Sequence, residues 1–354
     1  MWGSDALKRI WKVGAAVGLI AALALVLTAS GRKGRDRIRI LYWNIQNGMW
    51  DGQEDNYDRF VDWVKAKRPD ICVWCEAKSN YKTASAEHFA EGEGYLPEHW
   101  GELAKRYGHK YWYMGGYRDN FPQVITSRYP ITSMARIVGA EPDSVVAHGA
   151  GWACIDIRGR KLNLVTLHTW PQAYSFGIPP EERAASKAEH GGDRYRRKEI
   201  EYVCTHTILT RPGARNELWM MMGDFNSRSP KDNWIYGYPE GAPELMVHDY
   251  VLSRTPYLDL IAERDPASFY SSTGKRSRID YIYCTPPVAA AVQEARIVSD
   301  FYTLPVRDPG GLSNFYHPSD HRPILVDLDF GGTPRDSGLQ QGEEPVDFEG
   351  VRNY

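Results

Sequence analysis

Short apolar segments, each containing or running into a polar side chain, are the feature that most constrains the fold of this chain. They span residues 38–42, 71–74, 152–157, 162–167, 218–222, 279–283 and 324–328. Their length and their content of Val, Ile, Leu and aromatic residues are typical of buried strands. We therefore expect a protein built on β-sheets, with polar side chains collected where the strands end.

Helices and hairpins alternate between these strands. Apolar residues recur at helical spacing from Tyr57 to Val64, Pro69 limits that helix, and a second helix is predicted over 195–209. A turn over 158–160 joins two of the strands as a hairpin. This mixture predicts mixed sheets of the α/β class. The connections over 77–122, 169–193 and 227–257 are expected to be long loops that shape a binding surface.

Composition divides the chain into three parts. With 354 residues, 42% of them hydrophobic, it can form one large α/β domain, which we expect over 37–330. Basic residues precede an uncharged apolar stretch over 13–31, so residues 1–36 are predicted to be a signal peptide or a membrane anchor. Residues 331–354 are rich in Gly, Pro and acidic residues and predict a flexible tail. We accordingly expect a membrane-anchored or secreted protein whose large domain is exported.

Charge and cysteine content argue against two classes of protein. The formal net charge of -2 lacks the basic excess of proteins that grip long stretches of nucleic acid. Five cysteines are too few and too scattered for a disulfide framework. Cys72 and Cys75 lie three residues apart in one predicted strand and point to opposite faces, so we interpret them as core residues rather than a redox or zinc pair. We expect a monomer.

Polar residues with ligand chemistry stand at the ends of several predicted strands. They are Asn44, Glu76, His168, Asp224, Asn226, Asp280, Asp320 and His321. Carboxylate and amide oxygens are the ligands that Mg²⁺ prefers, and an acid inside an apolar strand, such as Asp280, is costly unless it is paired. Taken singly, each residue also fits a turn former, a cap or a core side chain. Together they predict one polar site on the rim of the sheets.

Two basic clusters accompany this set. They comprise Lys275, Arg276 and Arg278 in one stretch, and Arg196, Arg197 and Lys198 on the predicted second helix. Such clusters either contact phosphate or form solvated faces, and we favour the solvated faces.

Several sequence blocks carry a resemblance to a known family. In chain order they are Tyr42–Gly48, Pro69–Glu76, Ser127–Ile131, Leu167–His168, Gly223–Asn226, Arg278–Ile282 and Ser319–Pro323. Over residues 37–330 these blocks resemble the endonuclease/exonuclease/phosphatase superfamily, which has the deoxyribonuclease I-like fold. The resemblance implies a four-layered α/β sandwich, in which two packed mixed β-sheets are flanked by helices and the active site lies at one edge.

The resemblance also implies metal-dependent hydrolysis of phosphoric esters. Glu76 would be the principal ligand of Mg²⁺ or Mn²⁺, with Asn44 and Asp320 close to the metal. Asp224 would activate the attacking water, and Asn226 would hold that water or a phosphate oxygen.

The remaining residues would act on the charge of the phosphoryl group. His321, oriented by Asp280, would stabilise the developing negative charge, and His168 would contact the phosphate or assist the leaving oxygen. Arg118 is assigned as a further phosphate contact, although the stretch over 115–123 departs from the family pattern. Cys75 also departs from it, because Gln is usual before the metal-binding Glu.

The resemblance leaves the substrate open. We expect a phosphodiesterase of the nuclease type. The alternatives are a sphingomyelinase-like phospholipid phosphodiesterase acting on head groups, an inositol or sugar phosphatase, and a non-catalytic binding protein on the same fold. The site chemistry is common to all of these enzymes, so the loops decide among them.

Overall fold

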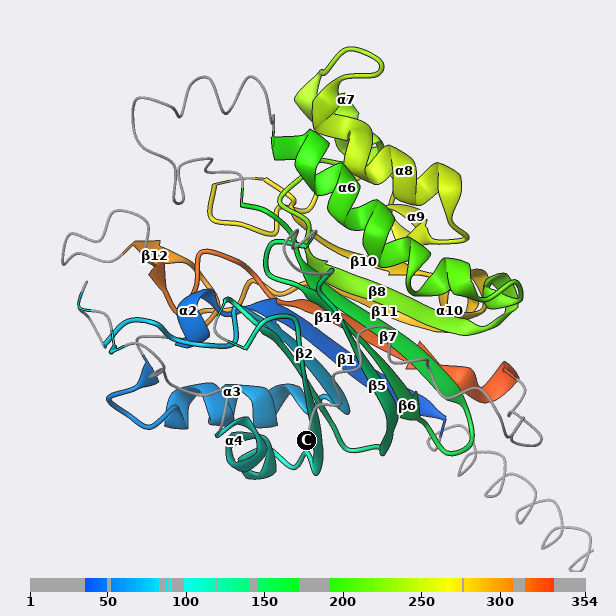
Figure 1. The fold of residues 1–354 in the computed structure, drawn as a ribbon. Helices are drawn as coiled ribbons and strands as arrows, with labels where there is room; N and C mark the ends of the chain where they lie inside the picture. The colour runs from blue at the N-terminus through cyan, green and yellow to red at the C-terminus, as the bar shows by residue number, and fades with distance from the viewer. Residues whose placement is uncertain are drawn as a thin grey trace, which may run out of the picture.

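Two six-stranded β-sheets, packed face to face, form the centre of the protein, and helices cover their outer sides (Figure 1). The computed structural model describes residues 36–49, 52–82, 87, 89–90, 99–118, 120–139, 146–171, 192–275, 277–307 and 316–333. Both sheets mix parallel and antiparallel pairs. The predicted fold class is confirmed.

The first sheet has the strand order β11-β14-β1-β2-β4-β3. Its strands are β1 (Arg37–Asn44), β2 (Ile71–Cys75), β3 (Tyr111–Gly115), β4 (Gln123–Ser127), β11 (Val292–Ile297) and β14 (Ile324–Asp329). β1 and β2 are parallel, and parallel neighbours need a crossover. The segment with α2 (Gln46–Met49) and α3 (Asp58–Lys67) supplies it.

The second sheet has the order β5-β6-β7-β8-β10-β9. Its strands are β5 (Ile131–Ile137), β6 (Ala150–Asp156), β7 (Lys161–His168), β8 (Leu218–Asp224), β9 (Leu258–Asp259) and β10 (Asp280–Cys284). β7 and β8 are its parallel pair, and α6 (Gly192–Thr205) lies in the crossover between them. A small separate ladder joins β12 (Val306–Arg307) to β13 (Tyr316–His317).

Buried apolar side chains form three clusters that define the layers. Val73 of β2 and Met222 of β8 belong to the cluster between the sheets. Trp74, the next residue of β2, points the other way and packs with α3 and with α4 (Trp100–Arg106). Trp219 of β8 packs with α6 and with α8 (Met246–Arg254). Because both faces of the central strands are covered, their sequences are continuously apolar.

Most predicted elements are confirmed, and two predicted loops are wrong. The stretch over 77–122 contains α4 and β3, and the stretch over 227–257 contains α7 (Asn233–Tyr236) and α8. These elements are only four to nine residues long, and so short a segment does not show a clear period in the sequence. Two further short helices, α9 (Leu260–Arg264) and α10 (Pro286–Ala291), flank β10.

The cysteine interpretation is confirmed in the described residues. Cys72 and Cys75 of β2 are both fully buried and carry free thiols. Cys72 belongs to the cluster beneath α3, and Cys75 belongs to the cluster between the sheets. The two sulfurs therefore lie on opposite faces of one strand, which excludes a shared metal or a disulfide between them.

The predicted N-terminal segment and tail lie almost wholly outside the described residues. The described part of the chain contains no helix that is long and apolar enough to cross a membrane. The membrane anchor, the export of the domain and the flexible tail stay predictions.

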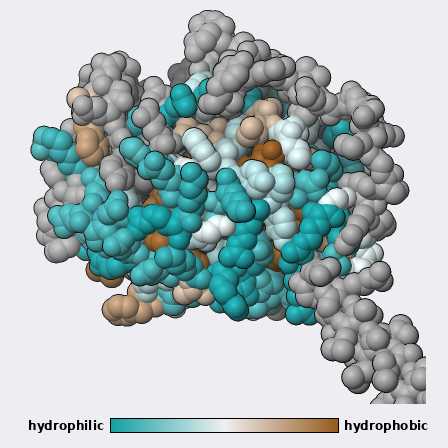
Figure 2. Space-filling view, turned by 90° about the horizontal axis from the view of Figure 1, so that it is seen from below, coloured by the Kyte–Doolittle hydropathy of each residue, from teal (hydrophilic) through white to brown (hydrophobic). Residues whose placement is uncertain are grey.

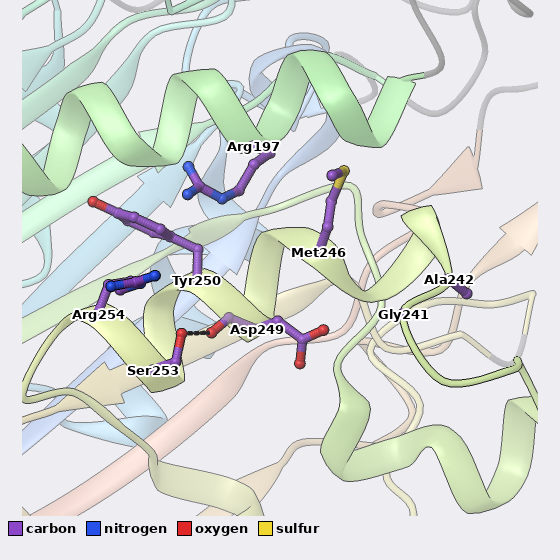
Figure 3. A pocket seen from close by; sticks show the side chains of 8 residues that line it. All are labelled: Arg197, Gly241, Ala242, Met246, Asp249, Tyr250, Ser253 and Arg254. Atoms are coloured by element: carbon purple, nitrogen blue, oxygen red, sulfur yellow. Dashed lines mark hydrogen bonds between the residues drawn. The ribbon is translucent and has the colours of Figure 1, made fainter.

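The outer helices present a polar surface. The face seen from below in Figure 2 is largely hydrophilic. On the opposite side of the molecule, Arg197 of α6 points toward Tyr250 of α8, with its guanidinium carbon 3.6 Å from the ring centroid (Figure 3). These residues line an open groove with Gly241, Ala242, Met246, Asp249, Ser253 and Arg254. Arg197 thus contributes to helix packing and does not approach the strand ends.

Arg278, in the loop before β10, points into the protein and anchors that loop through buried hydrogen bonds. Its guanidinium donates to both carboxylate oxygens of Asp259, at 3.0 and 2.6 Å, and to Asp232 at 2.7 Å. All three side chains are buried. The suggestion that this arginine belongs to a phosphate-binding or solvated cluster is therefore wrong, because its guanidinium is buried and its N–H groups donate to carboxylates within the protein.

We predict that Arg278→Met destabilises the protein by about 3–5 kcal/mol, because it leaves two buried carboxylates without their cation. Urea unfolding followed by circular dichroism measures the loss. The control is Arg215→Met, at an exposed position, which should change the free energy of unfolding by less than about 0.5 kcal/mol. Equal stabilities of the two variants would contradict the structural role of Arg278.

Candidate active site

Strand alternation carries the polar residues into the gap between the sheets. Met222 of β8 faces the first sheet, so Asp224, two residues further on, does too. The same alternation puts Asn44 of β1, His168 of β7 and Asp280 of β10 on inner faces. The site is therefore the polar end of the interface whose centre is the apolar core.

Asp224 lies at the centre of the second sheet's contribution. It pairs in register with His168 on one side and with Asp280 on the other. The Nε2 atom of His168 lies 3.8 Å from Oδ2 of Asp224. Three consecutive strands thus deliver an imidazole and two carboxylates to one point.

Asn44 links the two sheets. Its amide nitrogen lies 3.1 Å from Oε1 of Glu76 and 3.2 Å from Oδ2 of Asp224. Its amide oxygen accepts a 3.1 Å hydrogen bond from the backbone of Gln46. In this orientation Asn44 donates to both carboxylates and fixes their positions, with its oxygen turned away from them.

Glu76 follows β2 in a left-handed conformation with φ 56°, which breaks the strand alternation and turns its carboxylate toward the site. The backbone N–H of Asn47 donates to its Oε2 at 3.0 Å. Gly48 (φ 62°) makes this approach possible, because a Cβ atom there would lie 2.5 Å from the backbone nitrogen of Ser79. The strained turn of α2 therefore holds the Glu76 carboxylate.

A hydrogen-bonded chain crosses from one sheet to the other through Asp280. Tyr42 of β1 donates to Oδ1 of Asp280 at 2.7 Å, and Oδ2 of Asp280 lies 2.7 Å from Nδ1 of His321. All three side chains are buried. The second ring nitrogen of His321, Nε2, then faces Asp224, 3.7 Å from its Oδ2.

The segment before β14, residues 319–321, is held by hydrogen bonds to β1. Ser319 donates to the carbonyl of Asn44 at 2.7 Å and accepts from the backbone N–H of His321 at 3.1 Å. The indole of Trp43 donates to the carbonyl of His321 at 3.0 Å. Asp320 is half-buried, and its Oδ1 lies 3.7 Å from Nε2 of His321. The predicted pair Asp320 and His321 therefore reaches the site on a rigid segment.

Asn226 supports Asp224 from the backbone side. It has a φ of 47°; its N–H donates to Oδ1 of Asp224 at 2.9 Å, and its side-chain amide donates to the carbonyl of Thr169 at 3.2 Å. Thr169 in turn donates its N–H to the carbonyl of Asp224 at 3.0 Å. Asn226 therefore joins the ends of β7 and β8 and orients the central carboxylate.

Burial controls the protonation of these groups. Burial and the neighbouring Asp280 raise the pKa of Asp224 well above its usual value, and burial and Asp320 raise the pKa of Glu76. Burial and His148 lower the pKa of His168 well below its usual value. For His321, burial favours the neutral ring, but Asp280 and Asp320 outweigh it and raise the pKa well above the ordinary value.

Oxygen donors with uncompensated negative charge suit a hard divalent cation. Among the described residues, two groups bring ligand atoms within 4.8 Å of one another: Glu76 with His168 and Asp224, and Asp224 with Asp280 and His321. The carboxylate of Asp320 raises the pKa of Glu76, because the two negative charges repel each other. Neither side chain is fully buried. These two carboxylates fit a metal site that remains open to substrate.

The structure adds residues that received no role from the sequence. Tyr42 shares the inner face of β1 with Asn44, and its two-residue spacing was a usable signal. His148 stacks on His168 with ring centroids 4.3 Å apart. It precedes a strand by two residues and gave no sequence signal. Arg118 is exposed on the loop between β3 and β4, which also carries Phe121, 6.2 Å from the His168 ring.

Comparisons with known proteins bear on the family and on the fold. The model of the Endonuclease/Exonuclease/phosphatase family matches residues 41–321. No curated protein matches the chain by sequence. An AP endonuclease from Archaeoglobus fulgidus has a similar structure, with a TM-score of 0.55 and 16% identity over 82% of this chain and 99% of that one.

Two further structures share the fold. The human Nocturnin catalytic domain with a bound sulfate anion has a TM-score of 0.52 and 15% identity, over 82% of this chain and 93% of that one. D. rerio TDP2 complexed with a single-strand DNA product has a TM-score of 0.51 and 15% identity, over 82% and 98%. At such identities the structures show a common fold, and the family match supplies the chemistry. The chain belongs to the endonuclease/exonuclease/phosphatase family, whose members are metal-dependent phosphoric ester hydrolases.

Proposed function

We propose that the chain is a divalent-metal-dependent phosphodiesterase of the nuclease type, in which Asp224 activates the attacking water. The observation that supports this most is the convergence on Oδ2 of Asp224. The amide of Asn44 lies 3.2 Å from it, and the Nε2 atoms of His321 and His168 lie 3.7 and 3.8 Å away. Such a carboxylate is surrounded by groups that orient it and bind the anionic substrate.

Glu76 and Asp320 are proposed to hold Mg²⁺ or Mn²⁺, with Asn44 beside them. When bound, the ion neutralises charge on a phosphate oxygen and orients the phosphoryl group. Asn44 keeps the Glu76 carboxylate in place through its 3.1 Å hydrogen bond.

Asp224 is proposed to accept a proton from the water. Its raised pKa makes the carboxylate a stronger base, and the nearby His321 favours its ionised form. The N–H of Asn226 holds Oδ1 at 2.9 Å, which leaves Oδ2 on the side of the two imidazoles. The proton thus moves to an oxygen whose position is already fixed.

The two histidines are proposed to act on the phosphate in different charge states. His321 has a raised pKa and is cationic at neutral pH, so it stabilises negative charge that develops on the phosphoryl oxygens. His168 has a lowered pKa and is neutral, so it contributes a hydrogen bond rather than a charge. Arg118 stays a proposed contact for a distant part of the substrate.

The balance of charge in the site favours a diester. The acidic side chains of the site are Glu76, Asp224, Asp280 and Asp320, and His321 is the buried cation among them. A bound divalent ion and His321 together would offset most of this negative charge, and the carboxylates would remain in slight excess. A monoanionic diester meets less repulsion from these carboxylates than a dianionic monoester does. Phospholipid head groups and inositol phosphates remain the alternative substrates.

We predict that Asp224→Asn and Glu76→Gln each reduce the hydrolysis of bis-p-nitrophenyl phosphate by about 10²-fold or more, because they remove the base and the metal ligand. Release of nitrophenol is measured with Mg²⁺ and with Mn²⁺. Asp62→Asn, at an exposed position on α3, is the matched control. Equal activity in all four proteins would refute the catalytic assignment.

We predict that Asp280→Asn changes the pH dependence of kcat. In the parent, the raised pKa keeps His321 protonated as pH rises through neutrality. In the variant, burial is no longer offset by that carboxylate, so the imidazolium and the activity should be lost as pH rises from about 6 to about 8. A profile with the parent's shape at lower amplitude would show that Asp280 does not act through the charge of His321.

We predict that kcat/KM for bis-p-nitrophenyl phosphate exceeds that for p-nitrophenyl phosphate by about 10-fold or more, because of the charge difference between the two esters. A panel of duplex DNA, RNA, sphingomyelin and inositol phosphates, assayed in one metal buffer, then identifies the substrate class. Preference for the monoester, with release of inorganic phosphate from inositol phosphates, would favour the phosphatase alternative.

A further inference from the structure

One face of α6 carries three charged side chains that point into the protein. Asp193, Arg196 and Glu199 are spaced three residues apart, which places them on the same side of the helix. Arg196 is 4% exposed and Glu199 is fully buried. Charged residues are rarely buried in this way unless the surrounding structure uses them.

The partners of these side chains are the backbone segments that leave the active site. The guanidinium of Arg196 donates to the carbonyls of Trp170 and Pro171, at 3.1 and 3.3 Å. One carboxylate oxygen of Glu199 accepts the N–H of Trp170 at 2.9 Å. The helix therefore binds both the N–H and the carbonyl of the residue that lies two positions after His168.

The other oxygen of Glu199 reaches a different segment. It accepts the N–H of Ala147 at 2.7 Å, and His148 follows directly in the chain. Asn120 adds a second tie, because its amide donates to the carbonyl of Ala147 at 3.0 Å and its oxygen lies 3.0 Å from Nδ1 of His148. A single buried carboxylate thus joins the two segments that carry the stacked histidines.

The N-terminal end of the same face is tied to the end of β8. The hydroxyl of Ser227 donates to Oδ1 of Asp193 at 2.7 Å, and Arg196 donates to the same oxygen at 3.2 Å. Ser227 follows Asn226, which orients Asp224. The face therefore contacts the backbone beyond both catalytic strands of the parallel pair, β7 and β8.

We propose that Glu199 is a positioning residue, which holds the Ala147 and Trp170 segments together so that His148 stacks on His168 and fixes the direction of its ring. The stack has ring centroids 4.3 Å apart and planes inclined by 27°, and Phe121 meets both rings edge-on at 5.2 and 6.2 Å. An imidazole packed between other rings has few alternative orientations. The inference rests on the proposed function of His168.

The test is Glu199→Gln, which keeps the size of the side chain but replaces one acceptor oxygen with an NH₂ group facing a backbone N–H. We expect kcat for bis-p-nitrophenyl phosphate to fall about 10- to 100-fold with little change in KM, because small misplacements of catalytic groups have effects of this order. The matched control is Glu201→Gln on the exposed face of α6, which should retain the parent's kcat.

A double-mutant cycle separates positioning from general destabilisation. In a His168→Ala background, Glu199→Gln should cause no further loss of kcat, because its effect acts through the absent ring. An equal loss in both backgrounds would overturn the inference and leave the proposed function intact.

A readout without catalysis keeps the inference testable even if the parent cleaves none of the substrates. The ring ¹H and ¹³C signals of His148 and His168 in the full chain report the stack, and single histidine substitutions assign them. Glu199→Gln should shift both sets, and Glu201→Gln should leave them unchanged. Unshifted signals in Glu199→Gln would overturn the inference.

Discussion

The hydrogen-bonded chain from Tyr42 through Asp280 to His321 is the interaction on which the site depends. It starts in one sheet, passes through the other and returns to the segment before β14. Each link is 2.7 Å long and buried, so it tolerates little change in the distance between the sheets. The packing of the apolar core between the sheets therefore sets the geometry of the proposed catalytic groups directly.

The site between the sheets concentrates negative charge where the side chains are shielded from water, which is unfavourable for folding. Burial, and after it the neighbouring carboxylates, raise the pKa values of Glu76, Asp224 and Asp320. A cationic imidazole and a divalent ion are the natural partners of such a group. The same features that make the site costly to fold thus make it suitable for an anionic substrate that arrives with a metal ion.

Buried charges outside the site serve its surroundings. Arg278 satisfies Asp259 and Asp232 and so fixes the loop that leads into β10 and Asp280. Arg196 and Glu199 do the same for the segments beyond His168 and before His148. In both places a charged side chain binds backbone or carboxylate groups near a strand that carries a site residue, which gives the site rigid support on its outer side.

Seven of the strands, and the set of polar residues near their ends, are readable from the amino-acid sequence, and the resemblance to the family implies the layered sandwich. A short, continuous apolar run is a local property of the sequence, and the runs that lead to Asn44, His168 and Asp224 indicate buried strands. The sequence blocks that resemble the family then linked these polar residues to one active site. The elements α4, β3 and α8 were missed, because segments of five to nine residues are too short to show a clear period.

How the polar residues act on one another is set by the pairing of the strands and by the packing of the two sheets. Register across β7, β8 and β10 placed two carboxylates and an imidazole side by side, and the packing of the sheets brought Tyr42 to Asp280. The roles of Arg278 and Glu199 also depend on the tertiary structure, because the sequence does not show whether a charged side chain is solvated or buried. Burial and partner distance, which fix pKa and orientation, arise only when segments distant in the chain meet.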